Sequence, residues 1–286
     1  MTFFHQAPAV YTGAVYLNVL DLNAMKDFYT GTIGFRVLSE MDHRIELTAD
    51  GKTPLLVLES RVGLHPKRPN RSGLYHFAIL LPSREDLGAA ALHFIRQGVR
   101  MGASDHYVSE ALYLNDPEGN GIEVYRDRPA DDWNWNGGLV DMATVALDMD
   151  GVVRSAQEAG RTWNGLPSET VMGHVHLHVS DLEETERFYR DGLGFEVVAS
   201  YPGTLFMSTA CYHHHLGLNV WNGEGIQAQE KDSAGLKAYT LVFPDTEAIR
   251  KAVEQLCAIG AEVSEEEGQI VAADPSGIRL ILQAIA

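Results

Sequence analysis

Apolar and polar side chains alternate in a short segment that recurs four times along the chain. At Val175, Leu177 and Val179 every second position is apolar, which is the period of a β-strand with one buried face. Apolar residues at helical spacing follow such segments, and Ser83 and Ser180 stand where a side chain could cap the helix. Short apolar runs between Gly, Pro and Asp turns complete the pattern, which predicts a βαβββ unit four times over.

Three pairs of matching segments support this division into units. They are Val15–Tyr29 with Val175–Tyr189, Leu74–Pro82 with Leu236–Pro244, and Asp116–Gly119 with Asp274–Gly277. We therefore expect an α+β protein with two tandem pairs of units, residues 1–129 and 169–286. The linker between them, residues 130–168, can contain a helix. The units are numbered one to four in chain order.

Composition and charge narrow the functions to be considered. Of the 286 residues, 45% are hydrophobic and 21% are charged, the balance of an ordinary soluble globular protein. The formal net charge of −17 would repel phosphate backbones and anionic lipid, so we expect neither nucleic acid nor a membrane as partner. Without an apolar run of roughly 20 residues or a secretion signal, the sequence predicts a cytoplasmic protein. A monomer and a homo-oligomer both stay open.

Histidine is the most informative residue type in this chain. There are 12 histidines, whereas the two cysteines lack the CxxC spacing of a thiolate metal site. Because the side chains of a strand alternate between its two faces, we compared positions that point the same way in each unit. In the opening strand these positions are Ala14, His76, His174 and Ala238, and in the last strand they are Leu58, Glu123, Asn219 and Ile281.

Three of these positions carry side chains that can bind a metal. His76, Glu123 and His174 offer two imidazoles and one carboxylate, the ligand set of a non-haem Fe(II) site with open coordination positions. A buried core histidine is the commoner interpretation of any one of them, but three at related positions favour a shared site. Position alone leaves iron, manganese, zinc and nickel open.

The repeated units resemble the vicinal oxygen chelate superfamily, which includes glyoxalase I, fosfomycin-resistance proteins and extradiol ring-cleavage dioxygenases. Unit two is also similar to the extradiol dioxygenase signature, which it matches at His106, Leu112-Tyr113, Asp116-Pro117-Glu118-Gly119 and Glu123. Ser104 departs from that signature, which prefers Gly, Asn, Thr or a β-branched apolar residue there. The superfamily resemblance covers nearly the whole chain and implies two cup-shaped mixed sheets. The signature implies an enzyme similar to the catechol 2,3-dioxygenases.

The same resemblance implies roles for individual residues. The metal, Fe(II) or alternatively Mn(II), would be bound by His76, Glu123 and His174. His106 and Tyr113 would contact the catechol, and dioxygen would open the ring beside the diol to give a semialdehyde. A further histidine that aids oxygen activation and proton transfer would come from the run His213, His214 and His215. Strand parity favours His215, because it shares a face with His213 and Asn219.

This ligand set makes a demand on the fold. Its members belong to units two and three, so these two units must share one cup, while units one and four form a second cup without metal. A single metal per chain follows. His176 and His178 share the face of His174 and could line the cavity or belong to the core. Trp133, Trp135 and Trp221 could pack between units or form the wall of a ring pocket.

Two alternative functions stay open. A glyoxalase-like lyase or isomerase uses a metal with two carboxylates, one of them as base, and Asn219 at the position related to Glu123 is a poor base. A metal-free protein that binds a small aromatic molecule is the other alternative, against which the complete ligand set argues.

Overall fold

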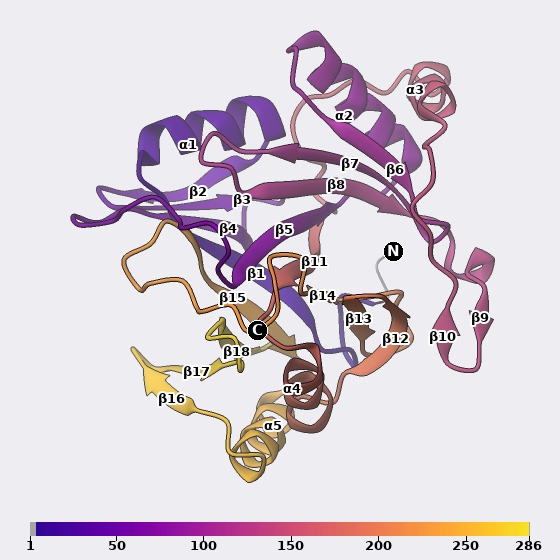
Figure 1. Ribbon diagram of the computed structural model, residues 1–286. Helices are drawn as coiled ribbons and strands as arrows, with labels where there is room; N and C mark the ends of the chain where they lie inside the picture. The colour runs from indigo at the N-terminus through magenta and orange to yellow at the C-terminus, as the bar shows by residue number, and fades with distance from the viewer. Residues whose placement is uncertain (1–3, 286) are drawn as a thin grey trace.

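The structure, a computed structural model, describes residues 4–285 and has the expected βαβββ order in each unit (Figure 1). Unit one consists of β1 (Tyr11–Asn18), α1 (Leu22–Phe28), the π-helical turn η1 (Tyr29–Ile33), β2 (Arg36–Met41), β3 (Arg44–Thr48) and β4 (Pro54–Glu59). Unit two consists of β5 (Gly73–Leu80), α2 (Arg84–Arg96), β6 (Gly102–Asp105), β7 (Ser109–Asn115) and β8 (Gly121–Asp127).

Units three and four repeat this order after the linker. Unit three consists of β11 (Val171–His178), α4 (Leu182–Arg187), the π-helical turn η3 (Phe188–Gly192), β12 (Glu196–Tyr201), β13 (Thr204–Ser208) and β14 (Leu216–Asn219). Unit four consists of β15 (Gly235–Phe243), α5 (Thr246–Ala258), β16 (Val263–Glu266), β17 (Gln269–Ala273) and β18 (Arg279–Ala284). The linker holds η2 (Ala130–Asp132), the hairpin of β9 (Trp135–Asn136) and β10 (Leu139–Val140), and α3 (Met149–Glu158).

The units pair across the linker to form two eight-stranded mixed sheets. The first sheet has the order β16-β17-β18-β15-β1-β4-β3-β2 and so combines units four and one. The second sheet has the order β12-β13-β14-β11-β5-β8-β7-β6 and combines units three and two. This confirms that the units which carry the predicted ligands share one sheet. The predicted boundaries at residues 129 and 169 divide the chain along its sequence but do not divide it into separate sheets. Each sheet takes one unit from before the linker and one from after it.

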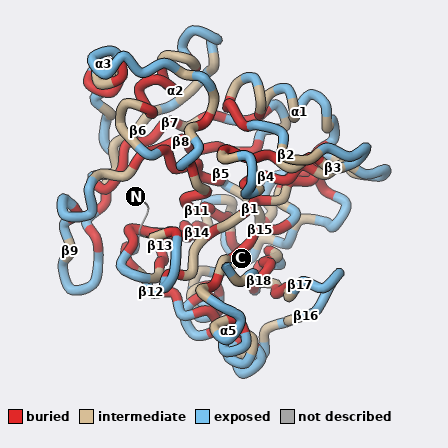
Figure 2. Tube along the Cα trace, turned by 180° about the vertical axis from the view of Figure 1, so that it is seen from behind, coloured by how far each residue is buried: buried red, intermediate tan, exposed pale blue. Residues whose placement is uncertain are grey.

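A shared hydrophobic core lies between the two sheets. The odd-numbered residues of the central strands, such as Val15, Leu17, Val175 and Leu177, are fully buried in it, and β1 packs against β11. Figure 2 shows the buried residues gathered along these central strands, while the β9–β10 hairpin and β16 are largely exposed. The even-numbered residues consequently face away from the core, onto the curled outer face of each sheet.

The two repeated motifs of the sequence contact each other in the structure. Tyr29 of unit one donates a hydrogen bond to Asp116 in the turn of unit two, over 2.7 Å, and Tyr189 does the same to Asp274, over 3.3 Å. Each turn is closed by its own aspartate, which accepts backbone N–H groups two and four residues further on. These bonds link unit one to unit two, and unit three to unit four.

Helix caps follow the sequence prediction in one case and differ in the other. Ser83 caps α2 by accepting the N–H of Asp86, as expected. Asp181, and not Ser180, caps α4, since its carboxylate accepts the N–H of Glu184 over 2.8 Å. Among residues 4–285, no helix is long and apolar enough to cross a membrane.

The pH dependence of stability should report on Asp274. Burial raises the pKa of this carboxyl group to about 7 from an ordinary 3.8, although hydrogen bonds from Ile278, Ser276 and Tyr189 act in the opposite direction. The folded state therefore holds the proton more tightly, a contribution that is complete below about pH 4 and is lost as the pH rises through 7. We therefore expect the Tm of Asp274→Asn minus the Tm of the unchanged protein to be larger at pH 8 than at pH 5. Thermal unfolding at both pH values measures this, and an equal difference in Tm at the two values would contradict it.

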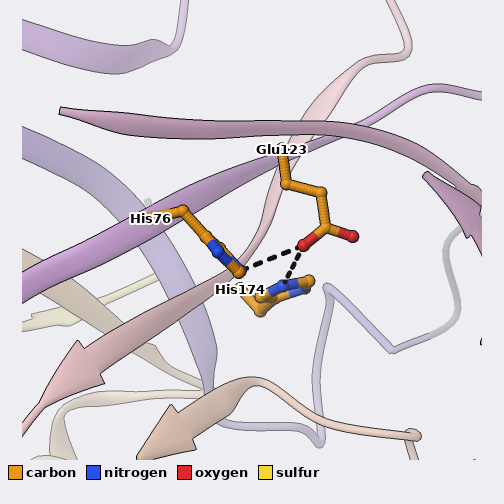
Figure 3. Close-up of side chains that lie close together, drawn as sticks. All are labelled: His76, Glu123 and His174. Atoms are coloured by element: carbon orange, nitrogen blue, oxygen red, sulfur yellow. Dashed lines mark hydrogen bonds and ion pairs between the residues drawn. The ribbon is translucent and has the colours of Figure 1, made fainter. Parts of the chain in front are cut away.

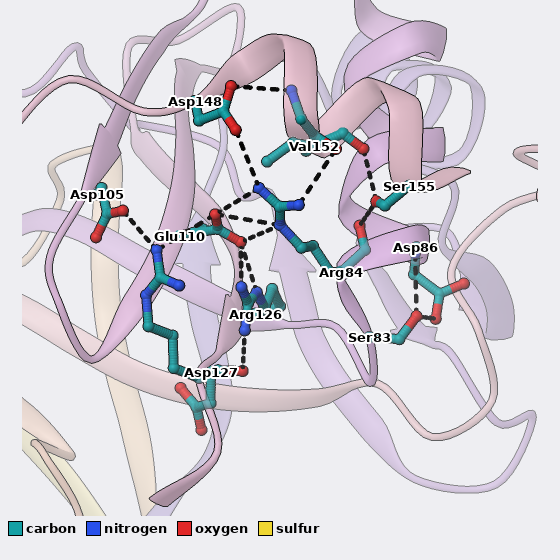
Figure 4. Close-up of polar contacts among 12 residues, drawn as sticks. Ser83, Arg84, Asp86, Asp105, Glu110, Arg126, Asp127, Asp148, Val152 and Ser155 are labelled. Carbon is teal, nitrogen blue, oxygen red and sulfur yellow. Dashed lines mark hydrogen bonds and ion pairs between the residues drawn. The ribbon is translucent and has the colours of Figure 1, made fainter. Parts of the chain in front are cut away.

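A buried carboxylate ties the linker to unit two (Figure 4). Glu110 on β7 is 1% exposed and is contacted by the guanidinium groups of Arg126, Arg84 and Arg128. Arg84 also donates to the carbonyl of Gly151 in α3, over 3.2 Å. Burial alone would raise the pKa of Glu110, but the contacts with Arg84 and Arg126 hold it below its ordinary value.

Removing this carboxylate should destabilise the protein strongly. Glu110→Ala leaves the buried Arg126 without its partner, and such a loss costs about 3–5 kcal/mol of the free energy of unfolding. Glu254→Ala is the matched control, because Glu254 pairs with Arg250 on the exposed surface of α5 and should leave Tm unchanged. Denaturant unfolding measures both, and equal effects of the two substitutions would refute this account of Glu110.

Candidate metal centre

Three side chains from three neighbouring strands meet on the outer face of the second sheet (Figure 3). His76 comes from β5, Glu123 from β8 and His174 from β11. The Oε2 atom of Glu123 lies 3.0 Å from Nε2 of His76 and 3.1 Å from Nε2 of His174. All three residues are buried, with exposed fractions of 6%, 2% and 1% in chain order.

These atoms are spaced as the ligands of a metal ion would be. Neighbouring ligands of a six-coordinate ion, with bonds of about 2.1 Å, lie about 3 Å apart. The Nε2 atom of His76 is buried and makes no well-directed hydrogen bond within the described chain, so its lone pair is available. Burial alone would raise the pKa of Glu123, but attraction to His174 and His76 holds it well below its ordinary value. The donor set therefore fits a divalent cation.

Strand register explains why the three meet, and it corrects one part of the sequence alignment. His76 precedes Ala78, which lies beside Glu123 in the parallel pair β5–β8, whereas His176 lies beside Gly217 in the pair β11–β14. The position related to Glu123 is thus Gly217 in unit three, and Asn219, which we predicted there, lies two residues further along. In unit one the corresponding residue is Val57, beside Tyr16, and not Leu58.

A cavity of about 450 Å³ opens in front of the three side chains. His106 and Tyr113, from unit two, for which the resemblance implied contact with a catechol, both line it, and the Tyr113 hydroxyl lies 2.6 Å from Nε2 of His106. The Nδ1 atom of His106 lies 2.6 Å from the carbonyl of Ala143 in the linker, which can only accept. His106 therefore carries its proton on Nδ1, and Tyr113 donates to Nε2. The linker closes one side of the cavity and orients His106.

Within the histidine run, the structure places His214 at the cavity, and not the His215 that strand parity favoured. His214 lines the cavity, with its ring centroid 4.1 Å from that of His174. His215 lies outside it: its ring packs against Tyr212 and Phe195, and Nε2 donates to the carbonyl of Phe4 over 2.9 Å. Strand parity failed here because β14 begins only at Leu216, after a turn in which Ala210 and Cys211 have positive φ.

A chain of groups within hydrogen-bond distance of one another, which the sequence did not predict, leads from the part-buried Asp127 to His214. Asp127, at the end of β8, lies 2.8 Å from Nε2 of His213, and Nδ1 of His213 lies 2.8 Å from Nδ1 of His214. Because the carboxylate only accepts, neutral His213 keeps its proton on Nε2, and His214 then donates from Nδ1. The Nε2 atom of His214 is left without a proton and can accept one. Burial lowers the pKa of His214 well below its ordinary value, and the neighbouring His174 and His213 act in the same direction.

The remaining residues singled out in the sequence lie at the edge of the cavity or outside it. His176 lines the cavity and accepts from Asn219 over 2.9 Å, and the Asn219 oxygen lies 2.7 Å from Nδ1 of His178. Trp221 stands at the cavity mouth and is 55% exposed, whereas Trp133 packs against Phe4 and Tyr212. The corresponding face of the first sheet carries Ala238 and Ile281. Within residues 4–285, His76, Glu123 and His174 form the one group of three histidine, cysteine or acidic side chains close enough together to hold a metal ion.

Comparisons with known proteins agree with the architecture and the motifs. The family model described as Glyoxalase/Bleomycin resistance protein/Dioxygenase superfamily matches residues 11–124 and 171–282. A protein of Bacillus subtilis (strain 168) named catechol-2,3-dioxygenase is 42% identical over 280 residues, which cover 96% of each chain.

Solved structures at low sequence identity share the fold. One is a protein of Bacillus subtilis subsp. subtilis str. 168, provisionally assigned as a dioxygenase, with a TM-score of 0.67 and 12% identity over 96% of this chain and 85% of that one. Another is glyoxalase I of Zea mays, with a TM-score of 0.58 and 16% identity over 96% and 92%.

Proposed function

The chain belongs to the glyoxalase/bleomycin resistance protein/dioxygenase superfamily and, within it, to the family of the catechol-2,3-dioxygenase relative, and from this premise we propose that it is an Fe(II)-dependent extradiol dioxygenase. The substrates are a catechol and dioxygen. The ring bond beside the diol breaks, and the two oxygen atoms enter the product, one in a new carboxylate and one in a new aldehyde. The observation that carries the proposal is the meeting of His76, Glu123 and His174 in front of a buried cavity.

The metal would be held by these three side chains, with Mn(II) as the alternative to Fe(II). When bound, it would favour the ionised catechol and supply the electron transfer that lets dioxygen react with the ring. One carboxylate and two neutral imidazoles would balance only one of the two positive charges of the metal ion. The remaining charge would favour an anionic oxygen donor as the next ligand.

The other residues of the cavity would bind the diol and move its protons. The Tyr113 hydroxyl and Nε2 of His106 form one hydrogen-bonded pair beside Glu123, and this pair would hold one catechol oxygen. The free Nε2 of His214 would accept a proton from the substrate and return it later, a general acid–base role that imidazole fills well. Asp127 and His213 would keep His214 in the tautomer that this role requires. His215, with both ring nitrogens already engaged, would stay out of the reaction.

Reconstitution tests the proposal. Protein loaded anaerobically with Fe(II) should consume one dioxygen per catechol when air is admitted and form a yellow ring-opened semialdehyde. Zn(II)-loaded protein is the matched control, because zinc has no redox chemistry and should give no oxygen uptake. Elemental analysis should find one metal per chain. Turnover of a hemithioacetal without oxygen uptake would instead identify the glyoxalase-like alternative, and a lack of metal binding would identify the metal-free binding protein.

A further inference from the structure

The two halves of the cavity differ in polarity, although they are built by related units. In unit two, Tyr113 lies beside Glu123 in the pair β7–β8. In unit three the related pair β13–β14 places Phe206 beside Gly217. Unit three therefore offers an aromatic ring where unit two offers a hydroxyl, and the imidazole of His176 covers Gly217 at the position where unit two has a carboxylate. A diol bound against unit two would direct the rest of its ring toward unit three.

Apolar groups form much of the wall of that second half, beside the polar Thr204, His176 and His214. Phe206, Pro202 and Tyr201 from unit three, Met142 from the linker and Trp221 line it. At the mouth, the ring of Trp221 lies edge-on to that of Tyr75, with centroids 5.2 Å apart. The cavity of about 450 Å³ falls in the size range of small-molecule sites, about 300–1,000 Å³, and so has room for a substituent beyond the diol ring.

The cavity also offers no counter-charge for an anion outside the metal position. Among the described residues that line it there is no lysine or arginine, and Glu123 is its one carboxylate. Arg128, on the neighbouring strand end, is engaged by Asp105 and Glu110. A carboxylate on the substrate would lose hydration there without gaining a lysine or arginine as counter-charge, and burial of an unpaired charge is strongly unfavourable.

We infer that this enzyme selects catechols with an uncharged, apolar ring substituent and discriminates against catechols that carry a carboxylate. The inference rests on the proposed function, since it names the substrate class of that site. The specificity comes from Phe206 in place of the Tyr113 hydroxyl, from the lack of lysine and arginine among the described lining residues, and from apolar walls that include Tyr201 and Trp221.

Three catechols of nearly equal shape test this inference: 4-isobutylcatechol, 3,4-dihydroxyphenylacetamide and 3,4-dihydroxyphenylacetate. A methylene group separates the substituent from the ring in each, so the diols have similar acidity. At pH 7 we expect kcat/KM for oxygen uptake by the Fe(II)-loaded protein to be at least about 100-fold lower for the acid than for the isobutyl compound, with the amide between them. Anaerobic titration of tryptophan fluorescence should give dissociation constants in the same order.

A pair of variants at the cavity wall tests the physical cause. Tyr201 lines the cavity and is 43% exposed, so a longer polar side chain fits there. Tyr201→Lys adds a cation, and Tyr201→Gln removes the same ring without adding charge. The ratio of kcat/KM for the acid to that for the isobutyl compound should be at least about tenfold higher in the lysine variant than in the glutamine variant.

The outcomes separate this inference from the proposed function. Equal kcat/KM and equal dissociation constants for the acid and the isobutyl compound would overturn the inference while ring cleavage stands. The same ratio in the lysine and glutamine variants would overturn the charge argument on which it rests. Failure of the metal-loaded protein to cleave any of the diols would overturn the proposed function, and the dissociation constants would still decide the inference.

Discussion

Glu123→Gln should abolish metal binding and, with it, ring cleavage. The substitution leaves two neutral imidazoles and an amide oxygen, so the site loses the negative charge that attracts a divalent cation. Loss of a group that only orients a ligand typically costs 10–100-fold in metal affinity, and for a direct ligand we expect a loss of at least about 100-fold. Metal content after dialysis and dioxygen consumption measure the two effects.

Glu59→Gln is the control for this substitution. Glu59 ends β4, the strand of the first sheet that corresponds to β8, and it pairs with Arg44 and Lys237 in a region without metal ligands. This variant should keep one metal per chain. Full metal occupancy in Glu123→Gln would show that the three side chains are not the ligands, and the oxygenase proposal would fall with them.

His214→Gln should lower kcat by roughly 10²–10⁴-fold while the metal stays bound, because that is the usual contribution of a positioned acid–base group. His214 faces the cavity with an unprotonated Nε2, and glutamine cannot take up a proton there. Single-turnover kinetics with metal-loaded protein, together with metal analysis, separate a slow proton transfer from a lost metal.

The matched substitution is His215→Gln, one residue further on. Its hydrogen bond to Phe4 and its packing against Tyr212 would be lost, so Tm should fall while kcat per bound metal changes little. A large loss of kcat in His215→Gln, with His214→Gln unaffected, would restore the assignment that strand parity favoured.

The parts of the site that lie on regular strands could be predicted from the sequence. His76, Glu123 and His174 all lie in strands whose neighbours are also strands, so a period of two places them on one face. The pairing of units two and three followed from the same three residues, because the ligands of one ion must share one sheet.

Between β13 and β14 the backbone is irregular, and successive side chains no longer alternate between two faces. Seven residues between β13 and β14 include two with positive φ, which reversed the expected facing of His214 and His215. Asp127 and the carbonyl of Ala143 could not be predicted at all, since they act across units and neither has a local pattern that signals it.

The pairing of the first and last units has a consequence for how the polypeptide matures. Strand β1 ends at Asn18, and its antiparallel neighbour β15 begins at Gly235. During synthesis one edge of β1 stays without its native partner strand until most of the protein has left the ribosome. Contacts so distant in sequence form slowly, because a long loop has to close first. A truncated product that stops before unit four could not complete the first sheet, although all three candidate ligands would already have been made.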